Sequence, residues 1–350
     1  METNINIKTI NYYFSRGKEI KTQIEHNKIV NYSYFSINEV TICHKIEKIP
    51  YYSNFFNILK DYDELNLSQL NENIIEKLKP TEDTKYYLFK YADKNSIDFI
   101  DAIYSSTCIK KLIFDLIHSF EHLVYGLHLL NENNICFFDV SPKNISFLQD
   151  FREKPVLSNF KFSLNTNKLT YTNLSHILNK LENFTFQPLE IHILYYFVKH
   201  HMVTISYSFI EEFCEDFMNS LPILRLFSDN YKTKYKEQCV QQMRKYINLS
   251  RTDIINDILE RNNKWDVYGI SMIFIQLFGC ISRIFFLKGT FMSKITLELS
   301  KNLHPDSDKR MSLEETLNVF NKYLNEEKDW KYINNLDNNK LTQLFDEFEK

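Results

Sequence analysis

The chain has 350 residues, of which 44% are hydrophobic, so it can bury a sizeable core as one large domain or as two lobes. Its 42 basic and 45 acidic residues give a formal net charge of -3, which excludes a bulk field that would demand a nucleic-acid or anionic-membrane partner. The six cysteines include no C-x-x-C pair, so neither a zinc ribbon nor a disulfide framework is expected, and a reducing compartment fits.

The N-terminal sequence METNINIKTI has no basic region followed by a long apolar run, and no stretch of about 18 uncharged apolar residues occurs. We therefore expect a cytoplasmic protein without a signal peptide or transmembrane segment, and no nucleic-acid or membrane partner. Only 5 residues are Gly, against 29 Phe and 22 Tyr, as in an AT-rich coding genome. Missing residue types therefore carry more weight than any single Asn or Lys.

The first third of the chain mixes strand and helix signals. Residues 1–35 carry short aromatic runs that favour two or three strands. The stretch from Ser36 to Leu70 is predicted as helix, with Ser36 as N-cap, Glu39 in the capping-box position and an apolar face that ends before Pro50.

An apolar strand is predicted at residues 85–91, KYYLFKY, and the polar residues 92–95 form a connector. That connector is the expected boundary between two lobes. Beyond it, apolar residues recur at three- and four-residue spacings from Ile109 to Leu130, which predicts a core helix with Ser106 or Thr107 as N-cap.

The rest of the chain begins with a predicted hairpin and continues as helix. Two apolar runs, 145–148 and 156–157, flank a polar turn and favour a two-stranded hairpin. Helical periodicity then dominates, at residues 174–182, 190–218, 234–260, 266–282, 290–300, 312–324 and 335–349.

The stretch NICFFDVSPKNISF, residues 134–147, carries a carboxylate at Asp139 and a carboxamide at Asn144. Such a pair alone is most simply a polar loop, because Asp and Asn cap turns throughout proteins. In a D-x-x-x-x-N loop between a long helix and a hairpin, however, Asp139 could accept the proton of an attacking hydroxyl and Asn144 could lend an amide oxygen to a metal ion. Pro142 stiffens the loop between them.

Several segments resemble the motifs of protein kinases in the same order. FFDVSPKN resembles the catalytic loop, and LSNFK resembles the metal-binding Asp-Phe-Gly segment, with Asn159 as the metal ligand. FQPLE resembles the end of the activation segment, KWDVYGISMIF the central helix of the large lobe, and LHPDSDKRMSLEETL the closing motif. The resemblance implies that Asp266 accepts backbone N–H groups of the catalytic loop and that Glu190 pairs with Arg310.

The resemblance covers about residues 85–325 and implies an α+β, bilobal protein kinase-like fold. Its expected parts are a reduced small lobe at 1–91, a large mainly helical lobe at 92–325 with an insertion at about 191–264, and a C-terminal helix at 326–350. An added structural layer or a partner-docking surface would both account for the insertion. ATP and Mg²⁺ are the implied cofactors, with Phe89 and Tyr91 on the nucleotide side. The chain most resembles Ser/Thr kinase-like proteins of large DNA viruses, which would place it in the host cytoplasm.

The sequence departs from the kinase pattern at residues that would serve activity. Phe137 and Phe138 replace the histidine and arginine before the catalytic aspartate, and Ser141 replaces the lysine that faces the transferred phosphate. Lys143 is expected to point elsewhere by spacing. Lys161 stands where the segment normally has glycine.

The small lobe lacks the expected phosphate-binding features. Only Gly17 lies in the first 125 residues, so no glycine-rich loop can bring backbone N–H groups to the phosphates. Lys21 and Lys28 are the candidate small-lobe lysines, and Glu39, ahead of Glu47, is the candidate helix glutamate.

Three hypotheses follow. The chain is a divergent Ser/Thr protein kinase that transfers the ATP γ-phosphate to the hydroxyl of a protein substrate, or a pseudokinase that works as a binding or scaffold module for a protein partner, or a small-molecule phosphotransferase. The third shares the D-x-x-x-x-N loop but does not predict Asp266 or the Glu190–Arg310 pair. His118 and His122 lie one helical turn apart without the H-E-x-x-H order, and we expect them to have structural or solvent-facing roles and not to be metal ligands.

Overall fold

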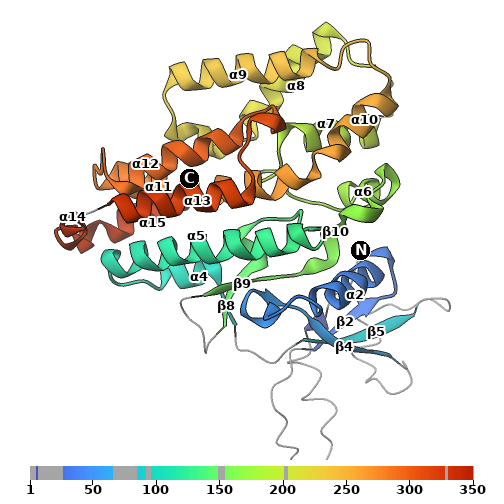
Figure 1. Ribbon diagram of the computed structural model, residues 1–350, viewed down its shortest axis with the longest axis horizontal. Coiled ribbons are helices and arrows are strands. Elements are labelled where there is room, and N and C mark those ends of the chain that lie inside the picture. The colour runs from blue at the N-terminus through green and yellow to red at the C-terminus, as the bar shows by residue number, and fades with distance from the viewer. Residues whose placement is uncertain are drawn as a thin grey trace, which may run out of the picture.

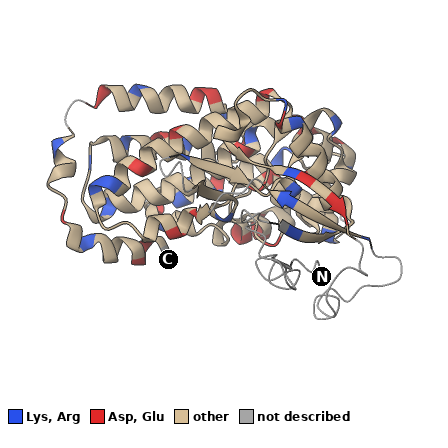
Figure 2. Ribbon diagram, turned by 90° about the horizontal axis from the view of Figure 1, so that it is seen from below, with Lys and Arg blue, Asp and Glu red and all other residues tan. Residues whose placement is uncertain are grey.

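A computed structural model describes residues 5–6, 27–65, 85–91, 96–148, 154–200, 204–327 and 330–349. It confirms the predicted α+β class, with a small sheet-containing N-terminal region below a larger helical region (Figure 1). Acidic and basic residues are interspersed over both regions, so in the described part neither charge dominates (Figure 2).

The N-terminal region is an antiparallel sheet with one helix packed against it. The strand order is β1-β2-β5-β4, and helix α2 lies on the side of the sheet nearer the helical region (Figure 1). The elements are β1 (Ile5–Asn6), β2 (Asn27–Asn31), α2 (Tyr34–Ile46), β4 (Leu59–Glu64) and β5 (Tyr86–Tyr91). The predicted strand at 85–91 is therefore confirmed, while the connector at 92–95 lies outside the described residues.

The predicted helix from Ser36 to Leu70 is wrong in its bounds. Helix α2 ends at Ile46, and Leu59–Glu64 is a strand paired with β5. Its N-cap is Ser33, whose hydroxyl accepts from the Ser36 N–H and which completes a capping box with the Ser36 side chain. Glu39 is instead buried against the sheet, because the helix starts a full turn earlier than the sequence pattern suggested.

The helical region opens with the predicted core helix and a second sheet. Helix α5 begins at Ile109 with Cys108 as N-cap, so the predicted caps were wrong; the Ser106 hydroxyl donates to the Cys108 carbonyl instead. The predicted hairpin is confirmed by antiparallel pairing of β8 with β9. The elements are β3 (Phe56–Asn57), β6 (Ser96–Asp98), α4 (Phe99–Tyr104), α5 (Ile109–Glu132), β7 (Ile135–Cys136), β8 (Ile145–Leu148), β9 (Pro155–Ser158), β10 (Leu164–Asn165) and α6 (Tyr171–Leu178).

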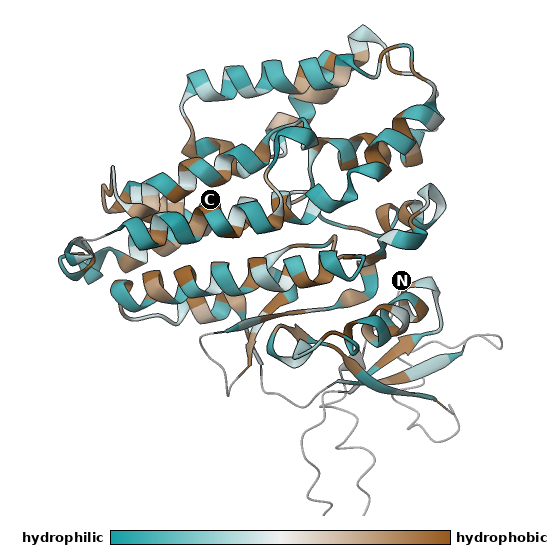
Figure 3. Cartoon of the chain, in the orientation of Figure 1, coloured by the Kyte–Doolittle hydropathy of each residue, from teal (hydrophilic) through white to brown (hydrophobic). Residues whose placement is uncertain are grey.

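Residues 191–200 and 204–264, which fall in the range predicted as an insertion, lie mainly in a layer far from the small sheet (Figure 1). The two long predicted helices, 190–218 and 234–260, are each broken in two. Ser206 caps a new helix, and the left-handed residue Asn248 followed by the N-cap Ser250 interrupts the second. The resulting helices are α7 (Leu189–His200), α8 (Tyr207–Asn219), α9 (Asp229–Arg244) and α10 (Arg251–Glu260), of which α9 is mostly hydrophilic (Figure 3).

Helix α11 (Trp265–Ile284) forms the centre of the helical region. It is long and apolar enough to cross a membrane by length and composition, but 83% of that window is buried inside the structure. It packs against α5, α12 (Phe291–Leu299), α13 (Leu313–Glu326) and α15 (Leu341–Glu349), and the short α14 (Lys331–Asn334) precedes the last of these. Its hydropathy is therefore that of a core helix.

Candidate functional site

Asp266, at the start of α11, binds the backbone of the loop that follows β7. Oδ2 of Asp266 accepts the Phe137 N–H and Oδ1 accepts the Phe138 N–H, both at 2.8 Å. The side chain is 1% exposed, and burial raises the pKa of the Asp266 carboxyl to about 6, while the two N–H donors oppose that rise. Phe138 has a φ of +68°, a strained conformation that these bonds stabilise.

The same loop sits directly on α11 because residue 269 is glycine. A Cβ added at Gly269 would lie 2.8 Å from the Val140 Cβ and 3.3 Å from the Phe186 carbonyl oxygen. Any larger side chain would therefore push the loop away from the helix.

Alanine at Gly269 should destabilise the protein by about 1–3 kcal/mol, because overpacking against a branched, buried side chain outweighs the helix-propensity gain of about 1 kcal/mol. Gly126→Ala in α5 is the matched control: its Cβ would meet the nearest atom, the Phe55 Cβ, at an ordinary 3.4 Å, so it should stabilise by about 0.5–1 kcal/mol. Urea unfolding of both variants measures the difference. If both variants were stabilised equally, Val140 would not be in close contact with residue 269.

Asp139 lies in this loop and is 4% exposed. Among the described residues its Oδ2 has no hydrogen-bond partner, but the Lys143 Nζ lies 3.8 Å away. The expectation that Lys143 points elsewhere is therefore wrong. Residues 142–144 form a 3₁₀ turn, which returns the Lys143 side chain toward Asp139.

Asn144 and Asn159 are brought together. The Asn144 Nδ2 donates to the Asp139 carbonyl at 2.8 Å and to the Ser141 hydroxyl at 3.2 Å. The Asn159 Nδ2 donates to the Asn144 Oδ1 at 2.8 Å. The two candidate metal ligands thus bond to each other.

This donor set does not fit Mg²⁺. The ion prefers charged oxygen ligands in near-octahedral geometry, whereas both side chains are neutral amides and the Asn144 oxygen already accepts an N–H. Within the described ranges, no cluster of three or more His, Cys, Asp or Glu residues could hold a metal ion either.

Phe137 and Phe138 fill space where the resemblance implies a histidine and an arginine. The Phe137 ring packs edge-on against Phe160 at 5.3 Å, and the Phe138 ring against Trp265 at 5.8 Å. Both side chains are buried. They link the loop to the core through apolar packing, and neither supplies a charge to the site.

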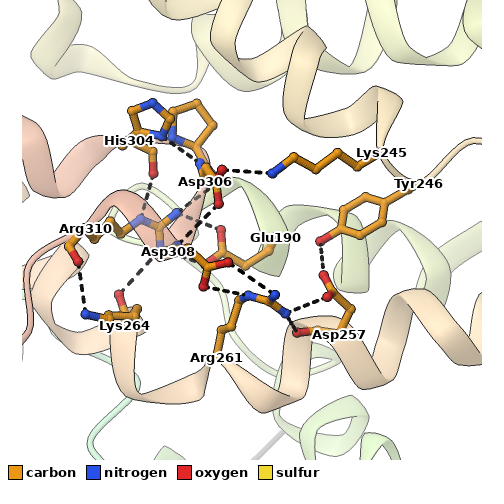
Figure 4. Close-up of polar contacts among 11 residues, drawn as sticks. Glu190, Lys245, Tyr246, Asp257, Arg261, Lys264, His304, Asp306, Asp308 and Arg310 are labelled. Atoms are coloured by element: carbon orange, nitrogen blue, oxygen red, sulfur yellow. Dashed lines mark hydrogen bonds and ion pairs between the residues drawn. The ribbon is translucent and has the colours of Figure 1, made fainter.

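Glu190 and Arg310 lie together in the helical region (Figure 4). The Arg310 Nη1 donates to Oε1 and Nη2 to Oε2 of Glu190, at 2.7 and 2.8 Å. Arg310 also donates to the carbonyl groups of Lys264, His304 and Pro305. The pair is bidentate and almost fully enclosed, with side-chain exposures of 0% for Arg310 and 8% for Glu190.

The small lobe places Glu39, Phe89 and Tyr91 near one another. Glu39 is 3% exposed, and the Tyr91 hydroxyl donates to its Oε1 at 3.0 Å. Phe89 is buried, and it lines a cavity of about 20 Å³ together with Lys28 and Glu39. Phe89 and Tyr91 thus make packing and hydrogen-bond contacts on the α2 side of the sheet.

The other small-lobe candidates lie in different parts of the chain. Glu47 is the C-cap of α2 and lies away from the sheet interior. Gly17 and Lys21 lie outside the described residues. Lys161, which stands where the resemblance implies a glycine, lines the same small cavity as Lys28 and Glu39, and its Nζ lies 4.8 Å from the centroid of the Phe162 ring.

His118 and His122 of α5 differ in their surroundings: His122 packs against neighbouring residues, and His118 faces solvent. The His122 Nε2 lies 2.9 Å from the Asn54 carbonyl oxygen, and its ring stacks on Phe55 at 4.5 Å. Burial lowers the pKa of His122. His118 is exposed and lines an adjacent surface hollow.

Asn38 was not expected to contact the site region. It lies on α2, and its Nδ2 donates to the carbonyl groups of Lys161 and Ser163, at 3.0 and 2.8 Å. The sequence signal that could have indicated this contact is the polar side chain one residue before Glu39. The bonds fasten α2 to the segment that follows β9.

Comparisons with known proteins add little beyond the fold. A scan against protein-family models finds no match, and a search of curated proteins finds none either. Among solved structures, the chain is similar to the twitchin kinase region from C. elegans (Fn31-NL-kin-CRD-Ig26), with 12% identity and a TM-score of 0.44. The match covers 93% of this chain and 45% of that one. At this identity and TM-score the likeness bears on neither activity nor substrate.

Proposed function

We propose that the chain is a protein kinase-like protein of the Ser/Thr type whose phosphoryl transfer is impaired, and that it works as a binding or scaffold module for another protein. One asymmetry supports the proposal. The contacts that hold the large helical region, Asp266 with the loop and Glu190 with Arg310, are complete. The residues that would face ATP phosphates and metal are neutral, at Ser141 and Asn159.

The cost of these neutral residues indicates how far activity falls. If the loss of a charged metal ligand removes about 3–4 kcal/mol of transition-state stabilisation, the rate falls roughly 100- to 1000-fold. The missing glycines would weaken ATP binding further, because backbone N–H groups could not approach the phosphates. A viral origin and action in the host cytoplasm belong to the same proposal and rest on the sequence resemblance.

Phosphoryl transfer is the second candidate, and the position of Lys143 favours it. The Lys143 ammonium lies 3.8 Å from the Asp139 Oδ2 and offers a cation where the family's lysine is missing. In that case Asp139 would accept the proton of the attacking Ser or Thr hydroxyl. The hydroxyl oxygen would bond to the ATP γ-phosphoryl group as ADP leaves.

A phosphate-transfer assay with labelled ATP and a generic protein substrate separates the two candidates. The binding-module proposal expects at most a trace of transfer from the native protein, in keeping with the reduced rate given above, and no thermal shift at millimolar ATP. Transfer at the rate of an unimpaired protein kinase that disappears in Asp139→Ala would overturn it. A further drop in Lys143→Ala, with Lys168→Ala unchanged as the exposed control, would then assign the cation to Lys143.

A further inference from the structure

The orientation of the Asn144 amide is fixed by its partners. Its Nδ2 faces the Asp139 carbonyl oxygen at 2.8 Å, and a carbonyl can only accept a hydrogen bond. The side chain is 1% exposed. If its Oδ1 and Nδ2 exchanged places, the N–H₂ group would be buried without an acceptor, facing the N–H₂ group of Asn159. Its Oδ1 must therefore point toward residue 159.

The group opposite that oxygen must be a donor or a cation. Asn159 supplies an N–H at 2.8 Å from a backbone with φ of +65°, a left-handed conformation that Asn and Asp both tolerate. The bond joins the loop of residues 137–144 to the segment after β9, the two parts of the chain whose side chains were expected to share a metal ion.

We infer that the Asn159 amide group takes the place of a divalent cation between the loop and the segment after β9, so the native protein joins these two segments without Mg²⁺. The inference deepens the proposed function and rests on it for the identity of the site. It gives the contact a definite chemistry: an N–H donor, and not a divalent cation, faces the Asn144 oxygen.

One substitution converts the amide into a cation ligand. Asn159→Asp keeps the size and the backbone preference but sets a carboxylate oxygen against the Asn144 Oδ1, which repels it when no cation lies between them. The variant should therefore be less stable than the native protein in EDTA. Mg²⁺ or Mn²⁺ should restore it, because the carboxylate and the amide oxygen then face one ion.

The experiment measures melting temperature and Mn²⁺ binding by isothermal titration for four full-length proteins: native, N159D, N144A/N159D and N165D. The control N165D adds the same charge in the same segment, where the Asn165 Oδ1 already accepts from the Lys45 Nζ at 3.0 Å, so a carboxylate there keeps its partner. We expect N159D to bind Mn²⁺ at least about tenfold more tightly than the native protein and N165D, a difference of about 1.4 kcal/mol. N144A/N159D should lose that gain.

Two results would overturn the inference. One is a native protein whose melting temperature rises with Mg²⁺ through a site that Asn144→Ala removes. The other is an N159D protein that is unchanged in EDTA, or that is not restored by either metal. Both are distinct from failure of the proposed function, which is measured by phosphate transfer from ATP and not by metal binding.

Discussion

Arg310→Ala should lower the free energy of unfolding by about 3–5 kcal/mol, the largest loss we expect from a single ion-pair substitution here. The change leaves the Glu190 carboxylate enclosed without its bidentate partner and frees three backbone carbonyl groups that Arg310 now binds. Urea unfolding followed by circular dichroism gives the value.

Arg244→Ala is the matched control. Its Nη2 lies 4.0 Å from the Glu211 Oε1, and both side chains are more than half exposed, at 58% and 60%. Solvent screens such a pair, so its loss should cost no more than about 1 kcal/mol. The double variant E190M/R310M should be more stable than Arg310→Ala, because it buries no unpaired charge. Similar values for Arg310→Ala and Arg244→Ala would contradict this view of the buried pair.

Asp266→Ala should cost about 2–6 kcal/mol, because it leaves the N–H groups of Phe137 and Phe138 buried without an acceptor, at about 1–3 kcal/mol each. Hydrogen exchange at these two amides should accelerate in step with the loss of stability. Asp266→Asn keeps one acceptor oxygen but turns an N–H₂ group toward the other donor, so its effect should be intermediate.

Asp253→Ala tests whether burial is the cause. Asp253 and Asp266 both lie in the first turn of a helix, where a carboxylate interacts with the helix dipole. Asp253 is exposed and Asp266 is not. A loss for Asp253→Ala within about 1 kcal/mol, against the larger loss for Asp266→Ala, separates the buried hydrogen bonds from the dipole. Equal losses would assign the effect to the dipole.

The α+β class and the contacts of Asp266 and of Glu190 with Arg310 could be anticipated because the motif order resembles that of protein kinases, and the resemblance implies these partners. Their burial agrees with the rule that a buried charge requires a partner. The hairpin at 145–157 was predictable from the residues themselves, since two apolar runs flank a short polar turn.

Features set by local geometry could not be anticipated in this way. The start of α2 depends on whether Ser33 or Ser36 accepts the first free N–H, and both sequences satisfy a capping pattern. Lys143 reaches Asp139 only because residues 142–144 form a 3₁₀ turn. Spacing alone could not distinguish that turn from an extended loop.

The two asparagines show a further limit. Asn144 and Asn159 were each assigned a metal on the strength of the oxygen that each amide carries. An amide also carries an N–H₂ donor. Whether its oxygen or its nitrogen faces a given group depends on neighbours that lie far apart in sequence. The bond between the two side chains is therefore a property of the folded arrangement.

Arg310 has one more consequence, for the segment between Glu190 and Asp266. It binds Glu190 at one end of that segment and the Lys264 carbonyl at the other, while the Lys264 Nζ donates back to the Arg310 carbonyl at 3.0 Å (Figure 4). The segment is thus a loop closed at its base. Loop-closure entropy grows only slowly with length, so residues added at the exposed turns of this segment should cost the rest of the fold little, whereas its helices place side chains in the common core.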